Sequence, residues 1–101
     1  MVTKAKRKVT IEEVRLQLTP ILVKHQVSRA AIFGSMATGA ARRSSDLDLL
    51  VEFSGDKSLL DLAALKLDIE SKMNRKADVL TYRGLHPLIK ENVLAQEIRI
   101  L

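Results

Sequence analysis

The pattern of apolar and polar residues divides the chain into alternating helical and strand-like segments. From Thr10 to about Gln26 apolar residues recur at helical spacing, and Thr10 with Glu13 forms a capping-box sequence at the start. Pro20 lacks a backbone N–H, so it should kink this helix or split it in two. The positions expected to face the core are Ile11, Val14, Leu18, Ile21 and Leu22.

Three short, largely apolar runs predict strands at residues 28–33, 47–53 and 77–82. The first run is almost continuously apolar, which suits a strand that is covered on both faces. Between the first two strands we expect a short helix at about residues 35–41 and a polar loop at 42–45.

Two further helices are expected after the second and third strands. Ser58 and Asp61 form a second capping box, opening a helix that ends near Asn74, and Pro87 suits the first turn of a last helix. The side chains expected to face inward are Leu59, Leu62, Ala63, Leu65, Ile69 and Met73 in one helix, and Leu88, Ile89, Val93, Leu94 and Ile98 in the other. Residues 99–101 are either a small strand or a frayed end. This order predicts an α/β fold of the α+β kind, a small mixed sheet with helices mainly on one face.

Composition narrows the class of protein. A length of 101 residues suits one domain at 10–101, preceded by a basic flexible leader at 1–9. No cysteine is present, which excludes disulfides and thiolate metal sites, and no apolar run reaches the length of a membrane span. Nothing has the form of a secretory signal, so a cytoplasmic protein is expected. The net charge is +5, and the leader is either simply solvated or attracts nucleic acid or an acidic partner.

Three aspartates are the candidate chemical groups. Asp46 and Asp48 stand two residues apart at the start of the second strand, so both should face one spot. Carboxylates held so close repel each other unless a cation lies between them, and oxygen ligands suit Mg²⁺. Asp78 lies between apolar neighbours in the third strand. If the two strands are adjacent, three carboxylates converge, a set that can hold two divalent cations about 4 Å apart.

A phosphate site is expected beside these carboxylates. Gly34 allows a close approach of the backbone, and Ser35 would lie at a helix N-terminus, where N–H groups and the helix dipole favour a phosphate. Ser35 could instead be only an N-cap. Arg42 and Arg43 either steer a triphosphate or belong to a solvated loop. A phosphate site beside a metal site indicates nucleotide binding.

Together, Gly34-Ser35, Gly39 and Asp46-x-Asp48 resemble the motif of the nucleotidyltransferase superfamily that has the DNA polymerase beta palm fold. The resemblance covers nearly the whole chain and is closest to the minimal nucleotidyltransferases (MNT), which pair with HEPN-domain toxins. It implies that Asp46 and Asp48 ligate two Mg²⁺ ions, with ATP or another NTP as substrate. The role it implies for Asp78 is to activate the acceptor hydroxyl, as a base or as a metal ligand.

The function implied is transfer of an NMP, AMP from ATP by this resemblance, onto a hydroxyl of a macromolecular acceptor. A HEPN toxin would be that acceptor and the chain its antitoxin, either alone or in an oligomer. Two alternatives stay open: a module that neutralises a toxin by contact, and a small-molecule adenylyltransferase. Thr38 and Met36 depart from the usual motif, because many relatives carry Arg where Thr38 stands, and this puts activity in doubt more than fold.

Two other residues have a structural and a functional interpretation. His25 is either an ordinary histidine of the last helical turn or a ligand or base. Tyr82 is either a strand-end aromatic or a modification site. The structural interpretation is favoured for both, and for His25 the reason is that no second His lies near it in the sequence.

Overall fold

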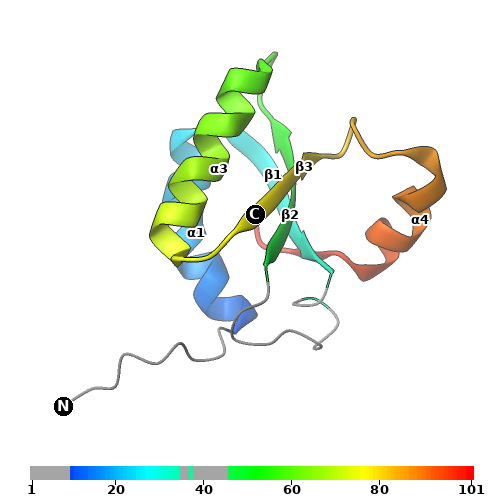
Figure 1. Ribbon diagram of the computed structural model, residues 1–101, viewed down its shortest axis with the longest axis horizontal. Helices are drawn as coiled ribbons and strands as arrows, with labels where there is room; N and C mark the ends of the chain where they lie inside the picture. Colours follow the sequence, from blue (N-terminus) through cyan, green and yellow to red (C-terminus); the bar gives the residue numbers. More distant parts are fainter. Residues whose placement is uncertain (1–9, 35–36, 38–45) are drawn as a thin grey trace.

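The computed structural model of the chain describes residues 10–34, 37 and 46–101 (Figure 1). The elements in these ranges are α1 (Ile11–Lys24), β1 (Val27–Phe33), β2 (Leu47–Phe53), α3 (Leu59–Met73), β3 (Ala77–Thr81), α4 (Pro87–Gln96) and β4 (Ile98–Arg99). The expected leader at 1–9 and nearly all of the expected helix and loop at 35–45 lie outside the described residues. None of the described helices has the length and apolar character that a membrane crossing needs.

The four strands form one mixed sheet in the order β3-β2-β1-β4. β1 pairs antiparallel with both β2 and β4, whereas β2 pairs parallel with β3. The parallel pair requires a crossover, and α3 supplies it. A small strand does form near the C-terminus, but at Ile98–Arg99 rather than at 99–101, so Ile98 belongs to this strand and not to the last helix as expected. β3 forms an outer edge of the sheet.

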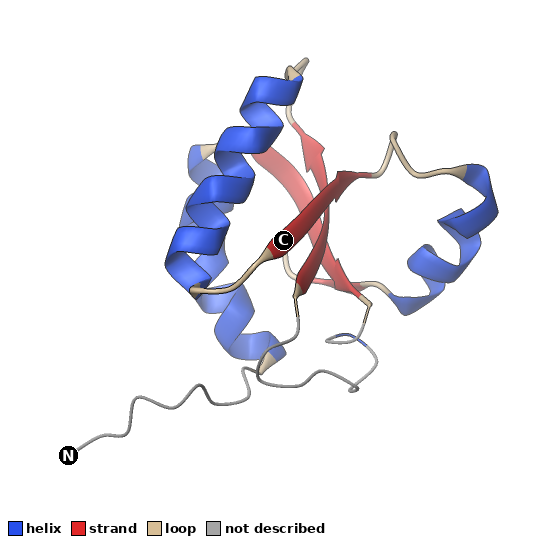
Figure 2. Cartoon of the chain, in the orientation of Figure 1, coloured by secondary structure: helices blue, strands red, loops and turns tan. Residues whose placement is uncertain are grey.

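Helices cover the two faces of the sheet unequally. α1 and α3 lie side by side on one face, and α4 lies on the other side of the sheet (Figures 1 and 2). The main core lies under α1 and α3, where Leu18, Leu49 and Leu65 are fully buried. A much smaller cluster, formed by Leu50, Leu85 and Val93, lies on the α4 side. The α4 face is therefore the more open of the two.

Both predicted capping boxes are present. Thr10 accepts a hydrogen bond from the backbone of Glu13, and Ser58 does the same for Asp61. His86 caps α4, where its Nδ1 accepts from the Leu88 N–H, and Pro87 takes the first helical position as expected. The first residues of these helices could be predicted from the sequence because capping is a local interaction.

Pro20 does not split the first helix, so this alternative was wrong, whereas the other alternative, a kink, stays a prediction. α1 runs as one α-helix from Ile11 to Lys24 with Pro20 inside it. Since Pro20 has no backbone N–H, it cannot donate to the carbonyl of Leu16, one turn earlier, and the helix continues without this hydrogen bond.

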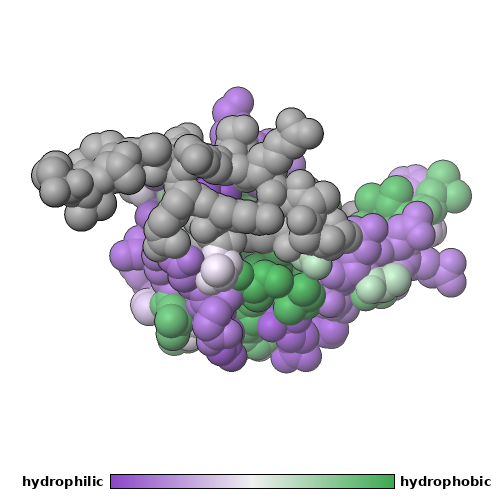
Figure 3. Space-filling view, turned by 90° about the horizontal axis from the view of Figure 1, so that it is seen from below, coloured by the Kyte–Doolittle hydropathy of each residue, from purple (hydrophilic) through white to green (hydrophobic). Residues whose placement is uncertain are grey.

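The expected apolar faces of the later helices are only partly correct. Leu65, Ile69 and Met73 of α3 are buried, but Leu59 in its first turn is exposed. In α4 only Val93 is buried, while Leu88 is 84% exposed. Figure 3 shows hydrophobic surface at the α4 side of the molecule. Helical spacing marks one face of a helix, but how much of that face is covered depends on the sheet behind it.

Candidate functional site

Asp48 and Asp78 are direct neighbours across two strands. They are register partners in the parallel β2–β3 pair, although they are far apart in the sequence. The alternate residues Leu47 and Leu49 of β2 and Val79 of β3 face the main core. Because side chains alternate along a strand, the two carboxyl groups point to the opposite, open face of the sheet.

Asp46 stands directly before β2 and is exposed. It precedes Asp48 by two residues, and its charge is one of the causes that raise the pKa of Asp48. The structure thus brings Asp48 and Asp78 together on the open face, at the start of two parallel strands, and Asp46 lies near enough for its charge to act on Asp48. The sequence-based expectation that β2 and β3 lie side by side is met.

Gly34 makes room for the carboxyl group of Asp48. A Cβ placed on Gly34 would lie 2.2 Å from Asp48 Oδ2, and the Gly34 φ of +74° belongs to the left-handed region. Any larger residue would therefore both strain the backbone and collide with Asp48. Ser35, the other half of the expected phosphate site, lies outside the described residues, as do Met36, Thr38, Gly39, Arg42 and Arg43.

The electrostatics of the site favour a cation. Partial burial, then the neighbouring Asp78 and finally Asp46 raise the pKa of Asp48 from its ordinary 3.8 to about 6. Each of these causes disfavours a negative charge on Asp48. A positive ion between the carboxylates would remove the repulsion, so the donor set fits a hard cation such as Mg²⁺.

This donor set is nevertheless not a complete metal cage. Among residues 10–34, 37 and 46–101, no three His, Cys, Asp or Glu side chains stand together so that they could hold a metal ion. Mg²⁺ usually takes one or two carboxylates and fills its other positions with water and substrate phosphates. The adjacent pair Asp48 and Asp78 fits that mode of binding. The assignment of all three aspartates as metal ligands stays a prediction.

A network that the sequence did not reveal lies at the end of β3. The hydroxyl of Tyr82 donates to Glu97 Oε1 at 2.6 Å, and the Arg29 guanidinium lies 4.2 Å from the centre of the Tyr82 ring. Arg29 also pairs with Glu97 at 3.5 Å. Burial and the Glu97 carboxylate raise the pKa of Tyr82 to about 12, so the hydroxyl keeps its proton. The network ties the segment after α4 to β3 and β1.

Tyr82 follows Asp78 by four residues, so strand alternation could have placed it on the open face, but no local signal pointed to Glu97. His25 also has a structural role, because its Nε2 lies 2.7 Å from Asp68 Oδ2, which joins the end of α1 to α3. Both residues thus have the structural role that the sequence favoured. Neither residue belongs to the group formed by Asp46, Asp48 and Asp78.

Comparison with known proteins places this geometry in a family. Residues 16–101 match the family described as polymerase beta, nucleotidyltransferase. The chain belongs to this nucleotidyltransferase family. A Methanocaldococcus jannaschii protein that is provisionally named a protein adenylyltransferase is 46% identical over 91 residues, which cover 90% of this chain and 98% of that protein.

Solved structures agree with this nucleotidyltransferase assignment. One that is provisionally described as a minimal nucleotidyltransferase has a TM-score of 0.75 and 39% identity, covering 89% of this chain and 95% of that one. An MNT antitoxin in complex with a tri-AMPylated HEPN toxin, from Shewanella oneidensis, gives a TM-score of 0.71 at 14% identity, covering 89% and 71%. At that identity the second likeness shows the fold alone. The expected palm fold is therefore confirmed.

Proposed function

We propose that this nucleotidyltransferase moves AMP from ATP onto a hydroxyl group of a macromolecular acceptor, in a Mg²⁺-dependent reaction. The observation that carries the proposal is the register of Asp48 with Asp78 on the open face, with Asp46 beside them. Charge neutralisation and positioning are the main requirements of phosphoryl transfer, and paired carboxylates next to a glycine turn suit both.

Different residues of the chain would have different roles in this reaction. Asp46 and Asp48 would hold Mg²⁺, which supplies positive charge that polarises the phosphates and the acceptor oxygen when it is bound. Gly34 lets the backbone and Asp48 approach each other closely, and Ser35 after it would bind the outer phosphates. Asp78, which is exposed and next to Asp48, would orient the acceptor hydroxyl and take its proton.

The acceptor we propose is a HEPN toxin, with the chain acting as its antitoxin. Two findings support this: the similar M. jannaschii protein bears the name of a protein adenylyltransferase, and the structural neighbour from S. oneidensis contains an AMPylated HEPN toxin. The acceptor would dock beside the carboxylates at the open face of the sheet.

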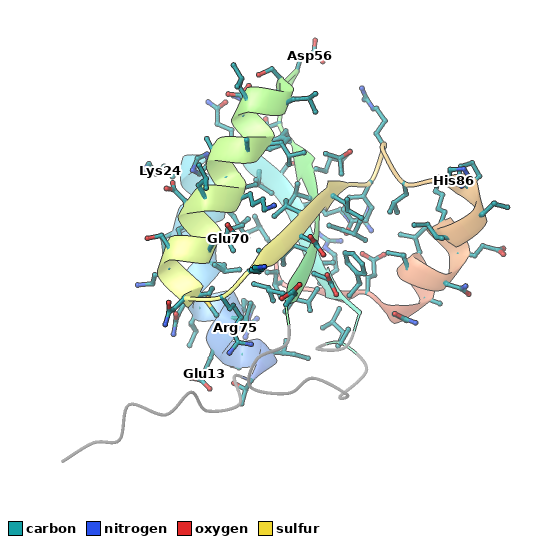
Figure 4. The ribbon with its side chains drawn as sticks, viewed as in Figure 1. Glu13, Lys24, Asp56, Glu70, Arg75 and His86 are labelled. Carbon is teal, nitrogen blue, oxygen red and sulfur yellow. The ribbon has the colours of Figure 1, made fainter. Side chains whose placement is uncertain are left out.

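The test is co-expression of the chain with the HEPN-domain protein expected beside it in the genome, followed by mass spectrometry of that protein. Addition of AMP is expected with the unaltered chain and with the control Asp56→Asn. Figure 4 shows Asp56 at the end of the molecule where β2 finishes, away from the start of β2. The adduct should disappear with Asp46→Ala plus Asp48→Ala. An adduct that persists in this double variant would refute the proposed site.

Neutralisation of a toxin by contact alone is the second candidate. Met36 and Thr38 favour it, because they replace residues that the usual motif carries near the triphosphate. Under this candidate the double variant still protects cells from the toxin and no AMP adduct is found with any variant. Growth of the co-expressing cells, scored beside the mass spectra, separates the two.

A further inference from the structure

β3 has an outer side on which no strand is paired. Among residues 10–34, 37 and 46–101 it is the terminal strand of the sheet, and the neighbour with which it pairs is β2. Lys76 accepts a hydrogen bond from Leu47, and Tyr82 donates one to Val51. In a parallel ladder every second residue bonds to the neighbour, so residues 76, 78, 80 and 82 direct their backbone groups toward β2. The backbone groups of Ala77, Val79 and Thr81 therefore point outward.

Part of this outer side is already used. Glu70 of α3 accepts from the Ala77 N–H at 2.8 Å, and Figure 4 shows Glu70 on the α3 side of the start of β3. Thr81 O accepts from the Gly84 N–H at 3.1 Å. Within the described part of the chain, four outward groups have no backbone partner: the Ala77 C=O, the Val79 N–H and C=O, and the Thr81 N–H. This is the pattern to which another strand can pair.

The exposed side chains of Asp78 and Leu80, next to this edge, suit the binding of an acceptor. Asp78 is exposed on the open face, and Leu80, two residues on, is 39% exposed on the same face. A residue opposite Asp78 on an added strand would have its Cβ about 5 Å from that of Asp78. Its neighbour two places along would contact Leu80, which offers an apolar surface.

We propose that the acceptor segment adds as an extended strand to the free edge of β3, with the hydroxyl residue opposite Asp78. This rests on the proposed function and names the form in which the acceptor binds. Main-chain hydrogen bonds would supply affinity without a defined sequence, while Asp78 and Leu80 would select a hydroxyl and an apolar residue at alternate positions. The free edge of β3 would thus be the binding site of the acceptor segment.

Atoms and electrons balance in the transfer that we propose at this edge. The acceptor oxygen forms a bond to the α-phosphorus of ATP, and the bond between that phosphorus and the bridging oxygen breaks. Pyrophosphate leaves with the bonding electron pair, and the hydroxyl proton passes to the Asp78 carboxylate and then to water. No oxidant, reductant or further reactant is required beyond ATP.

Backbone methylation of a peptide tests the docking. The probe is a synthetic seven-residue peptide with a central tyrosine between alternating valine and threonine, incubated with the chain and labelled Mg²⁺-ATP. N-methylation of one alternate set of peptide nitrogens should lower kcat/KM at least about tenfold, and methylation of the other set should not. Equal effects of the two sets would overturn the proposal, as would transfer to a helical tyrosine peptide but not to the extended one.

Hydrogen exchange gives a readout that does not depend on turnover. In the free chain the Val79 and Thr81 amides should exchange rapidly, while the Leu80 amide, bonded toward β2, is protected. Adding the unmethylated peptide should slow Val79 and Thr81 and leave Leu80 unchanged. Failure of the peptide to protect these amides, in a chain that binds Mg²⁺-ATP, would refute edge docking alone. Protection that appears without peptide as the protein concentration rises would show that a second copy occupies the edge, and would also refute it.

Discussion

Asp48 on β2 and Asp78 on β3 are register partners on the open face of the sheet, and Asp78 makes the negative charge on Asp48 less favourable. Nothing in the main core requires a carboxyl group at either position, because both side chains point away from it. The cost of placing them together is therefore expected to appear as a measurable loss of stability in the free chain.

Replacing Asp48 with Asn should stabilise the free chain at neutral pH. The folded-state pKa of Asp48, about 6, is above its ordinary 3.8, so its contribution is fully present below about pH 4 and is lost as pH rises through 6. Because the carboxyl group is partly exposed and water screens it, the gain for Asp48→Asn should be about 1 kcal/mol. Urea denaturation at about pH 4 and about pH 8 measures it.

The matched control is Asp56→Asn, which removes an acidic side chain at the other end of β2. It should leave the difference between the two pH values unchanged. If Asp48→Asn has no more effect on that difference than the control, the electrostatic account of the site is wrong.

Gly34→Ala should be destabilising for two separable reasons. The new Cβ would collide with Asp48 Oδ2, and the positive φ would be strained, which by itself costs about 1 kcal/mol. The loss should shrink when Asp48→Ala is combined with it, because the collision with the carboxyl group is then removed, while the backbone strain and a 3.3 Å contact to the Cβ of residue 48 remain. A double-mutant cycle of unfolding free energies measures the coupling. Strictly additive effects would show that the two residues do not touch.

Tyr82→Phe should cost about 1 kcal/mol, because it removes a hydrogen bond to the largely buried Glu97 and leaves that carboxylate with Arg29 alone. Hydrogen exchange should show faster opening of the last helix and of β4, while the α1 amides keep their protection. Tyr82→Phe combined with Glu97→Gln should recover part of the loss. Uniformly faster exchange over the whole chain would contradict this local role.

The parts of the fold that depend on neighbouring residues were predictable from the sequence. Thr10 with Glu13 marked the start of the first helix, and alternation placed Asp46 and Asp48 on one side of a strand. Asp78 could be assigned to the same site from the sequence because an aspartate between apolar strand residues is unusual. The parallel pairing that makes it the neighbour of Asp48 comes from the crossover through α3.

The features that the sequence could not predict depend on contacts between elements that are far apart in the sequence. Leu88 has helical spacing like Val93, but the small sheet does not extend far enough to cover it. Likewise, the sequence alone did not show that the first helix would continue through Pro20. Glu97 meets Tyr82 only because β4 returns to the edge of β1.

We propose that Asp46 and Asp48 bind a nucleotide through Mg²⁺. Isothermal titration of Mg²⁺-ATP into the chain and into Asp46→Asn, Asp48→Asn and Asp56→Asn tests this proposal. We expect binding by the unaltered chain and by Asp56→Asn, at least about tenfold weaker binding by Asp46→Asn and by Asp48→Asn, and none in EDTA. Equal affinity in all four chains, or no binding by any, would contradict it.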